Sequence, residues 1–249
     1  GRAPMLTTKW NQDYPYNVAC PIDPVSSRRC LTGCVATAMA QVLYYLNQQA
    51  GFPTGTTNDI AGYECNTIWG ELGKISVAAC PKATFEWGKM EKSYVGVDDA
   101  SKKAAVAKLM QYCGAAVHMQ YANSANGGSQ SSVGNIPEAL QTYFGFDRNV
   151  RFENRKNYTE AEWEDLIYNE VANGRPVIYG GQTAKDEGHA FVVHGYDGNG
   201  NYAINWGWGG YQDNFFYLSD LTPKSQGMGG GSGGYNYGQE AVIYLTKDD

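Results

Sequence analysis

The sequence predicts an α+β fold in which a helical lobe packs on an antiparallel β-sheet or barrel. Helical periodicity marks the chain up to about residue 174, whereas short apolar segments separated by turn residues follow from residue 176 on. Helices and strands segregated along a chain are typical of this class. No long Pro/Ser linker divides the 249 residues, so we expect one domain with two lobes. We assign residues 18–150 to the mainly helical lobe, and 175–249 with the N-terminal segment 1–17 to the mainly β lobe.

The first predicted helix begins beside a cysteine. Its apolar positions follow the spacing of one buried stripe, which consists of Val35, Met39, Val42, Leu43 and Leu46. We expect Thr32 to cap this helix, which places Cys34 in the first turn. The unpaired backbone N–H groups and the positive end of the helix dipole favour an anion there.

Further helices and strands follow from periodicity and turn residues. The helices cover residues 100–113, 135–144 and 159–174. The last of these opens with a capping box formed by Thr159 and Glu162. The strands cover residues 176–179, 189–194, 202–206, 215–218 and 241–245.

Cys34 and His189 have the properties of a nucleophile and its base. A thiol with a pKa near ~8.5 is largely neutral at pH 7, and a helix N-terminus together with an imidazolium can convert it to a thiolate. The alternatives are a buried structural cysteine and a core histidine bonded to a backbone carbonyl. A reactive thiol needs an electropositive, partly exposed position, which the start of a helix supplies.

A hairpin is expected to hold the imidazole. The strand that contains His189 leads into a turn cluster at residues 196–201 and returns through Asn205 and Trp206. We expect the return strand to place Asn205 beside His189, so that the amide oxygen accepts from one ring N–H and fixes the tautomer. The other ring nitrogen would then face the sulfur of Cys34, and Trp206 would shield this hydrogen bond from water.

Four segments of the chain resemble a known family. Residues 33–38, 188–192 and 205–210 resemble the signature blocks of the streptopain family, secreted bacterial cysteine peptidases of papain-like fold, and residues 10–17 resemble its N-terminal segment. The resemblance implies a peptidase with Cys34 as nucleophile, His189 as base and Gln12 as a donor to the oxyanion. Asn205 and Trp206 would orient and shield the imidazole.

The same resemblance implies substrate contacts and a maturation route. The substrate-lining residues would be Gly127, Gly128, Ser129, Gly188 and Trp208. An apolar side chain is expected at the substrate residue N-terminal to the cleaved one. A secreted or cell-envelope location and an N-terminal propeptide inhibitor, removed from this mature chain, are also implied.

The sequence departs from the papain pattern in two respects. Val35 follows Cys34 where papain relatives carry an aromatic residue, and the 155 residues from Cys34 to His189 slightly exceed the ~130–150 of those relatives. Residues 51–96 match the streptopain family least. Substrate preference is expected to differ there.

Six cysteines permit a partial pairing scheme. Cys34 is assigned to chemistry, and Cys113 lies on the apolar stripe of its helix, which predicts a buried thiol. Among the four cysteines that remain, separation along the sequence favours the pairs Cys20–Cys30 and Cys65–Cys80. These disulfides would suit an oxidising compartment. Because the spacing matches no known framework, reduced thiols remain the alternative.

Composition and a closer reading of the alternative motifs argue against several classes of function. A net charge of −6 and the absence of a Lys/Arg stripe disfavour a nucleic-acid partner, and no apolar run is long enough to span a membrane. His189 and His194 lie five apart on a strand and point to opposite faces, so no zinc site is expected. Residues 197–201 fit a hairpin turn better than a calcium loop, and residues 229–234 fit a loop beside the cleft better than a phosphate cradle.

The sequence therefore predicts a cysteine endopeptidase without a cofactor or metal, acting on protein or peptide substrates. Two other functions remain open at this point. One is a thiol acyltransferase or amidase that uses the same residues, and the other is a secreted binding module without activity. Turnover of casein or of peptide amides distinguishes the three.

Overall fold

The computed structural model describes residues 1–49, 56–65 and 74–246. Its main helices are α1 (Cys34–Asn47), α2 (Ala100–Ala116), α3 (Ile136–Phe144) and α4 (Glu160–Ala172). Short 3-10 helices occupy Trp87–Lys89, Ser124–Asn126, Val133–Asn135 and Arg155–Asn157. A small sheet pairs β1 (Tyr63–Cys65) with β2 (Ile75–Val77). The remaining strands are β3 (Arg151–Asn154), β4 (Val177–Gln182), β5 (Gly188–Tyr196), β6 (Tyr202–Asn205), β7 (Asn214–Phe216) and β8 (Tyr237–Ile243).

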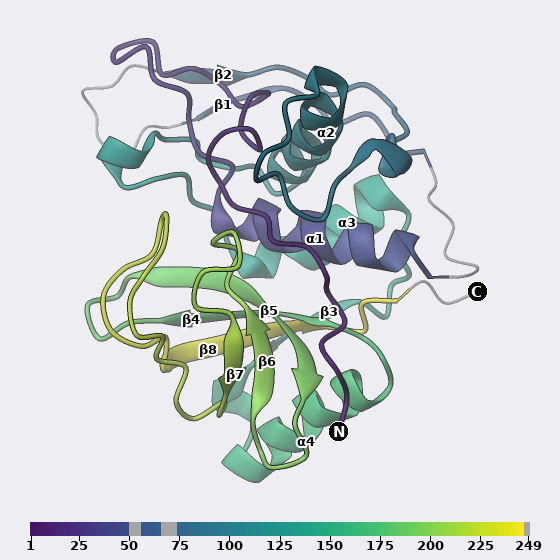
Figure 1. Ribbon diagram of the computed structural model, residues 1–249, viewed down its shortest axis with the longest axis vertical. Coiled ribbons are helices and arrows are strands. Elements are labelled where there is room, and N and C mark those ends of the chain that lie inside the picture. The colour runs from purple at the N-terminus through teal and green to yellow at the C-terminus, as the bar shows by residue number, and fades with distance from the viewer. Residues whose placement is uncertain (50–55, 66–73, 247–249) are drawn as a thin grey trace.

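The large sheet is antiparallel throughout and places its strands in the order β3-β8-β4-β5-β6-β7. Figure 1 shows α1, α2, α3 and the small sheet gathered above it, with α4 below. Both α1 and α4 contact β4 and β5, so the centre of the sheet is covered by helices. The predicted α+β class is therefore confirmed.

Local sequence signals explain how the helices begin. Thr159 accepts from the backbone N–H of Glu162 while the Glu162 side chain accepts from the N–H of Thr159, which is the predicted capping box of α4. Asp99 caps α2 through the N–H groups of Ser101 and Lys102. Both caps satisfy backbone donors that have no partner within the helix.

The strands were predicted less accurately than the helices. β8 begins four residues before the predicted segment at 241, and the sequence did not predict β1, β2 or β3. The first two are only three residues long, and β3 alternates charged Arg151 and Glu153 around Phe152 at the edge of the sheet. Such short or half-polar segments lack the apolar run by which a buried strand is recognised.

The predicted disulfides are absent, and all six cysteines are free thiols. Cys65 pairs with Ile75 across the small sheet, whereas Cys80 bridges to Ile60. The Cys65 sulfur donates to the carbonyl oxygen of Met119 at 3.4 Å and the Cys80 sulfur lies 3.9 Å from that of Ala78. Closeness in sequence did not indicate where the thiols point. The prediction that Cys113 is buried is confirmed.

No helix among residues 1–49, 56–65 and 74–246 is long and apolar enough to cross a membrane.

Candidate active site

Cys34 is the first residue of α1, as the sequence predicts. The helix is not capped by Thr32: Gly33 occupies the N-cap position, and the Thr32 hydroxyl lies 2.8 Å from that of Thr37. Gly33 has φ 87°, and a Cβ there would lie 2.6 Å from the Met119 side chain. This backbone conformation favours glycine, because a residue with a Cβ rarely adopts it. The sharp entry presents the thiol at the helix N-terminus.

The sulfur of Cys34 lies against β5. The backbone N–H of Ala190, the residue after His189, donates to Sγ at 3.3 Å. Burial raises the pKa of the Cys34 thiol, and the N–H groups of Ala190, Val35 and Cys34 itself lower it. Three backbone donors thus favour a thiolate against the effect of burial.

His189 is held by the backbone of Trp206. Its Nε2 lies 2.7 Å from the Trp206 carbonyl oxygen, and its Nδ1 is buried without a hydrogen-bond partner among the described residues. A carbonyl oxygen only accepts, so Nε2 must carry the hydrogen and the neutral ring keeps a free lone pair on Nδ1. Burial lowers the pKa of His189 to about 4, and the hydrogen bond to Trp206 opposes this shift. The free lone pair on Nδ1 allows this nitrogen to accept a proton, as a general base must.

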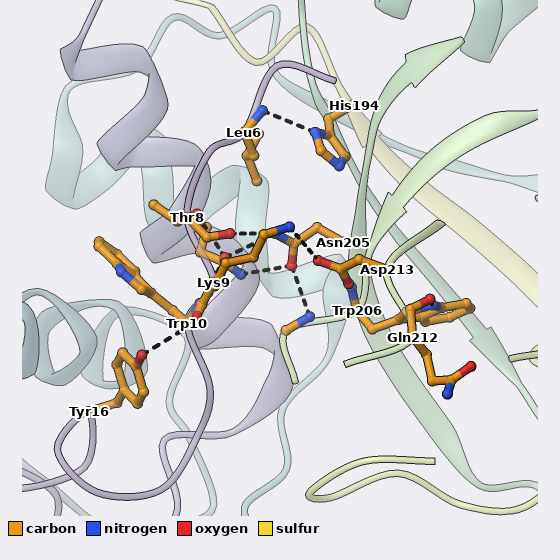
Figure 2. Close-up of polar contacts among 12 residues, drawn as sticks. Leu6, Thr8, Lys9, Trp10, Tyr16, His194, Asn205, Trp206, Gln212 and Asp213 are labelled. Carbon is orange, nitrogen blue, oxygen red and sulfur yellow. Dashed lines mark hydrogen bonds and ion pairs between the residues drawn. The ribbon is translucent and has the colours of Figure 1, made fainter. Parts of the chain in front are cut away.

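Asn205 does not occupy the position that the sequence predicts. It pairs with Val192 rather than with His189, because β5 and β6 meet in that register. Its side chain exchanges two hydrogen bonds with the Gln41 amide, at 3.2 and 3.1 Å, and also accepts from the N–H of Gly207 at 3.0 Å (Figure 2). The orienting hydrogen bond expected from Asn205 is therefore made by the carbonyl of the next residue.

The turn after β6 is anchored on both sides of Trp206. Its backbone N–H donates to Asp213 Oδ1 at 2.9 Å and its indole N–H donates to the Gln212 carbonyl at 3.0 Å (Figure 2). Asp213 in turn pairs with Lys9 at 3.4 Å. These contacts fix the carbonyl that faces His189.

Two indoles cover the imidazole. The ring of Trp208 stacks at 4.8 Å between centroids and 20° from the plane of His189, whereas Trp206 lies at 6.4 Å. Trp208, predicted to touch substrate, is buried and is not among the residues that line the cleft. The glycine-rich loop covers it instead, since a Cβ at Gly227 would lie 2.3 Å from its ring. Trp208 is thus the ring nearer to the imidazole.

Gln12 lies beside the nucleophile. Its Oε1 accepts from the N–H of Gly33 at 3.1 Å, which leaves Nε2 as the donor end, at 3.3 Å from the Met228 carbonyl oxygen. The side chain is buried yet lines the same cleft as Cys34. The amide nitrogen is therefore oriented by the residue that precedes the nucleophile.

A cleft of about 660 Å³ joins these groups. Cys34 and His189 both line it, together with the predicted contacts Gly127, Ser129 and Gly188. Gly128 does not line it, and the hydroxyl of Ser129 donates to the Leu31 carbonyl at 2.7 Å. Ser129 thus ties its loop to the segment before α1. The glycine-rich loop borders the cleft through Gly229–Gly231, as the sequence predicts.

The residues of the two alternative metal-site motifs make hydrogen bonds with backbone N–H groups. His194 Nδ1 accepts from the N–H of Leu6 at 3.0 Å (Figure 2). Asp197 accepts from the N–H groups of Asn199 and Asn201 and so closes the predicted hairpin turn. In the part of the chain that the structure describes, no three ligating side chains are grouped to hold a metal ion.

Comparison with known proteins identifies the family of the chain. The model of the peptidase C10 family matches residues 10–216. The chain belongs to this family. Streptopain of Streptococcus pyogenes is 35% identical over 243 residues, which cover 94% of this chain and 59% of streptopain. This chain thus spans less than two thirds of streptopain.

Two solved structures share the fold. Active interpain A of Prevotella intermedia superposes with a TM-score of 0.83 at 32% identity, covering 99% of this chain and 95% of that one. A fragment of prointerpain A from the same organism gives 0.78 at 30% identity, covering all of this chain and 73% of that one. The papain-like fold that the sequence predicts is thereby confirmed.

Sequence reasoning missed the functional groups that belong to the backbone. The Trp206 carbonyl and the Ala190 N–H contact His189 and Cys34 directly, and neither depends on a side chain. A motif of residue types cannot reveal them. The signature block at residues 205–210 indicated that the turn after β6 belongs to the site, but not which backbone group contacts His189.

Proposed function

We propose that this chain is a cysteine endopeptidase that hydrolyses peptide bonds through a thioester on Cys34. The observation that carries the proposal is the hydrogen bond between His189 Nε2 and the Trp206 carbonyl, because it fixes the tautomer and leaves Nδ1 free. His189 and Cys34 line one cleft, and the sulfur contacts the residue after His189. Nδ1 would accept the thiol proton as the sulfur attacks a peptide carbonyl.

The charged form of this pair depends on its surroundings. Burial favours the neutral form of both groups, since it raises the pKa of Cys34 and lowers that of His189 to about 4. Attraction between thiolate and imidazolium, strong in a site with few waters, acts in the opposite direction. The N–H groups at the start of α1 and at Ala190 add to it. Transfer of the thiol proton to Nδ1 would therefore rely on this attraction and on these N–H groups to oppose the effect of burial.

The oxyanion would be stabilised by two N–H donors. One is Nε2 of Gln12, and the other is the backbone N–H of Cys34, which as the first residue of a helix has no partner within it. His189, now protonated at Nδ1, would give its proton to the leaving amine. A water deprotonated at the same nitrogen would then hydrolyse the thioester.

We further propose protein or peptide substrates, inhibition by an N-terminal propeptide and a secreted or cell-envelope location. Membership of the peptidase C10 family supports the proposed substrates and location, and the structure of the prointerpain A fragment supports the propeptide. Asn205 acts by holding the turn that carries Trp206, and Gly127, Ser129 and Gly188 border the bound peptide.

The test is hydrolysis of casein and of peptide amides by the wild type and by Cys34→Ala. We expect cleavage by the wild type, none above background by Cys34→Ala, and unchanged circular dichroism. Cys113→Ala is the matched control, because Cys113 is buried in α2 away from the cleft. Activity retained in Cys34→Ala contradicts the assignment, and transfer of the acyl group mainly to an added amine would favour an acyltransferase.

A further inference from the structure

The proposed oxyanion donor is held by a loop that has no role in the steps above. Gln12 Nε2 donates to the Met228 carbonyl oxygen at 3.3 Å, and Gln12 Oε1 accepts from the N–H of Gly33. An amide nitrogen carries two hydrogens, so the bond to Met228 occupies one and leaves the other for the substrate oxyanion. Because an amide group is planar, the Met228 carbonyl also sets the direction of this second N–H.

The glycine-rich loop, residues 226–235, approaches Gln12 at a point where it lacks a side chain. Gly229 has φ 74°, and a Cβ at this position would lie 2.9 Å from Gln12 Nε2. A larger residue would therefore displace either the loop or the amide. Gly229–Gly231 and Gln12 line the same cleft. The backbone of the loop is thus in contact with the oxyanion donor within the cleft.

A buried hydroxyl joins the two sides of this loop. Tyr235 is fully buried, and its hydroxyl accepts from the N–H of Gly231 at 3.1 Å and donates to Gln226 Oε1 at 2.7 Å. Gln226 precedes Met228 in the chain and Gly231 follows it. One hydroxyl therefore connects both sides of the segment that contacts the oxyanion donor.

The loop has another side-chain contact, which is more exposed. The N–H of Ser232 donates to Glu187 Oε1 at 3.3 Å, and both of these residues are exposed. Water can replace such a hydrogen bond, so it restrains the backbone weakly. The bonds of the Tyr235 hydroxyl are partly enclosed, and their loss leaves two polar groups without that partner. We therefore expect Tyr235 to set the conformation of the loop.

The ring of Tyr235 makes a separate contact with the base. It lies 5.3 Å between centroids from the imidazole of His189, at an interplanar angle of 35°. Phenylalanine keeps this ring contact and removes only the hydroxyl. The substitution Tyr235→Phe therefore separates an effect on the oxyanion donor from an effect on His189.

We propose that Tyr235 is a positioning residue for the oxyanion donor. Its hydroxyl fastens the loop, the loop holds the Met228 carbonyl at Gln12, and this hydrogen bond aims the free N–H of Gln12 at the oxyanion. This inference rests on the peptidase function proposed above. The contribution of Tyr235 belongs to the transition state, because the negative charge on the attacked oxygen develops only there.

The experiment is a double-mutant cycle on one peptide amide. Tyr235→Phe should lower kcat by about tenfold with KM within about twofold, as for a hydrogen bond that acts in the transition state. In the Gln12→Ala background, Tyr235→Phe should change kcat by less than about twofold, because the donor that Tyr235 positions is gone. Tyr237→Phe is the matched control that should leave kcat unchanged, since Tyr237 is exposed on β8.

Two kinetic results would overturn the proposal. One is an equal loss of kcat for Tyr235→Phe in the wild-type and Gln12→Ala backgrounds, because the hydroxyl would then act on a group other than the oxyanion donor. The other is a wild-type kcat in Tyr235→Phe.

A measurement without turnover separates this inference from the proposed function. The side-chain NH2 of Gln12 gives NMR signals that are identified by their loss in Gln12→Ala, and the same spectra show whether each variant is folded. Hydrogen-bonded N–H groups exchange slowly with water, so this NH2 should exchange faster in Tyr235→Phe than in the wild type and Tyr237→Phe. This result supports the positioning of Gln12 even if the wild type cleaves no peptide, whereas equal exchange in all three proteins overturns it.

Discussion

His189 shows how a single hydrogen bond assigns a chemical role. Because a backbone carbonyl faces Nε2, the hydrogen must be there, and Nδ1 is left to act as a base. An asparagine side chain in the same place could present either its oxygen or its nitrogen, whereas a carbonyl has no such choice. The tautomer is thus fixed by the main chain of the turn that follows β6.

Gln12 supplies a prediction at the residue scale. Gln12→Ala should lower kcat by roughly 10²–10³ with a smaller effect on KM, because one oxyanion donor acts mainly in the transition state. Gln12→Glu keeps an acceptor for the N–H of Gly33 but has no N–H of its own when ionised, so a similar loss is expected. Steady-state kinetics on one peptide amide measure both. Normal kcat in Gln12→Glu would assign the donor elsewhere.

At the scale of elements, the site depends on contacts between α1, the N-terminal segment and the turn after β6. Gln41 of α1 bonds reciprocally with Asn205, and Asn205 also donates to the carbonyl of Thr8 at 3.0 Å (Figure 2). Thr8 in turn donates to Gln41 at 2.8 Å. This buried network joins the helix that carries the nucleophile to the turn that orients the base.

Asn205→Ala should therefore reduce stability as well as turnover. The substitution leaves the Gln41 amide nitrogen and the Thr8 carbonyl without their hydrogen-bond partner in the interior, which costs on the order of 1–3 kcal/mol of unfolding free energy. Turnover should fall less than in His189→Ala, because the Trp206 carbonyl remains bonded to the ring. Urea unfolding and kcat are the two measurements. Asn199→Ala, in the exposed hairpin turn, is the control that should alter neither.

If Asn205→Ala abolished activity while the unfolding free energy stayed at the wild-type value, the network of Asn205, Gln41 and Thr8 would not be a structural anchor. A direct contact of Asn205 with the reacting groups would then have to be invoked. A fall in stability with most of kcat retained agrees with an anchor that joins α1 to the turn after β6.

At the scale of the molecule, two buried histidines make the fold sensitive to acid. His194 accepts from the N–H of Leu6 and so joins the N-terminal segment to β5. Burial lowers its pKa to about 3, with Lys9 contributing, and lowers that of His189 to about 4. The unfolded chain, with a histidine pKa near ~6.5, then binds more protons than the native state below that pH. Stability should be fully present above about pH 6.5 and fall steadily towards pH 3.

His194→Asn should weaken this dependence, because an amide oxygen can accept from Leu6 yet does not titrate in this range. Thermal unfolding between pH 7 and pH 4 should show a smaller decrease in Tm for His194→Asn than for the wild type. The difference should vanish at neutral pH if packing is preserved. Equal slopes in both proteins would mean that His194 does not contribute to the acid sensitivity.

The sequence alone determined the elements whose signals are local. The stripe beginning at Val35, the capping box at Thr159 and the turn residues after β5 identified the helices and the hairpin correctly, because each depends on neighbours within a few positions. The motif blocks likewise gave Cys34, His189 and Gln12, which line one cleft. The chemical groups of these side chains follow directly from the residue types.

The tertiary structure decided what depends on register and on the backbone. Asn205 pairs with Val192, Trp208 stacks on the imidazole and the cysteines stay unpaired, since strand register and side-chain direction follow from packing between distant segments. Such juxtapositions depend on the sum of contacts over the whole chain, and no local pattern encodes them.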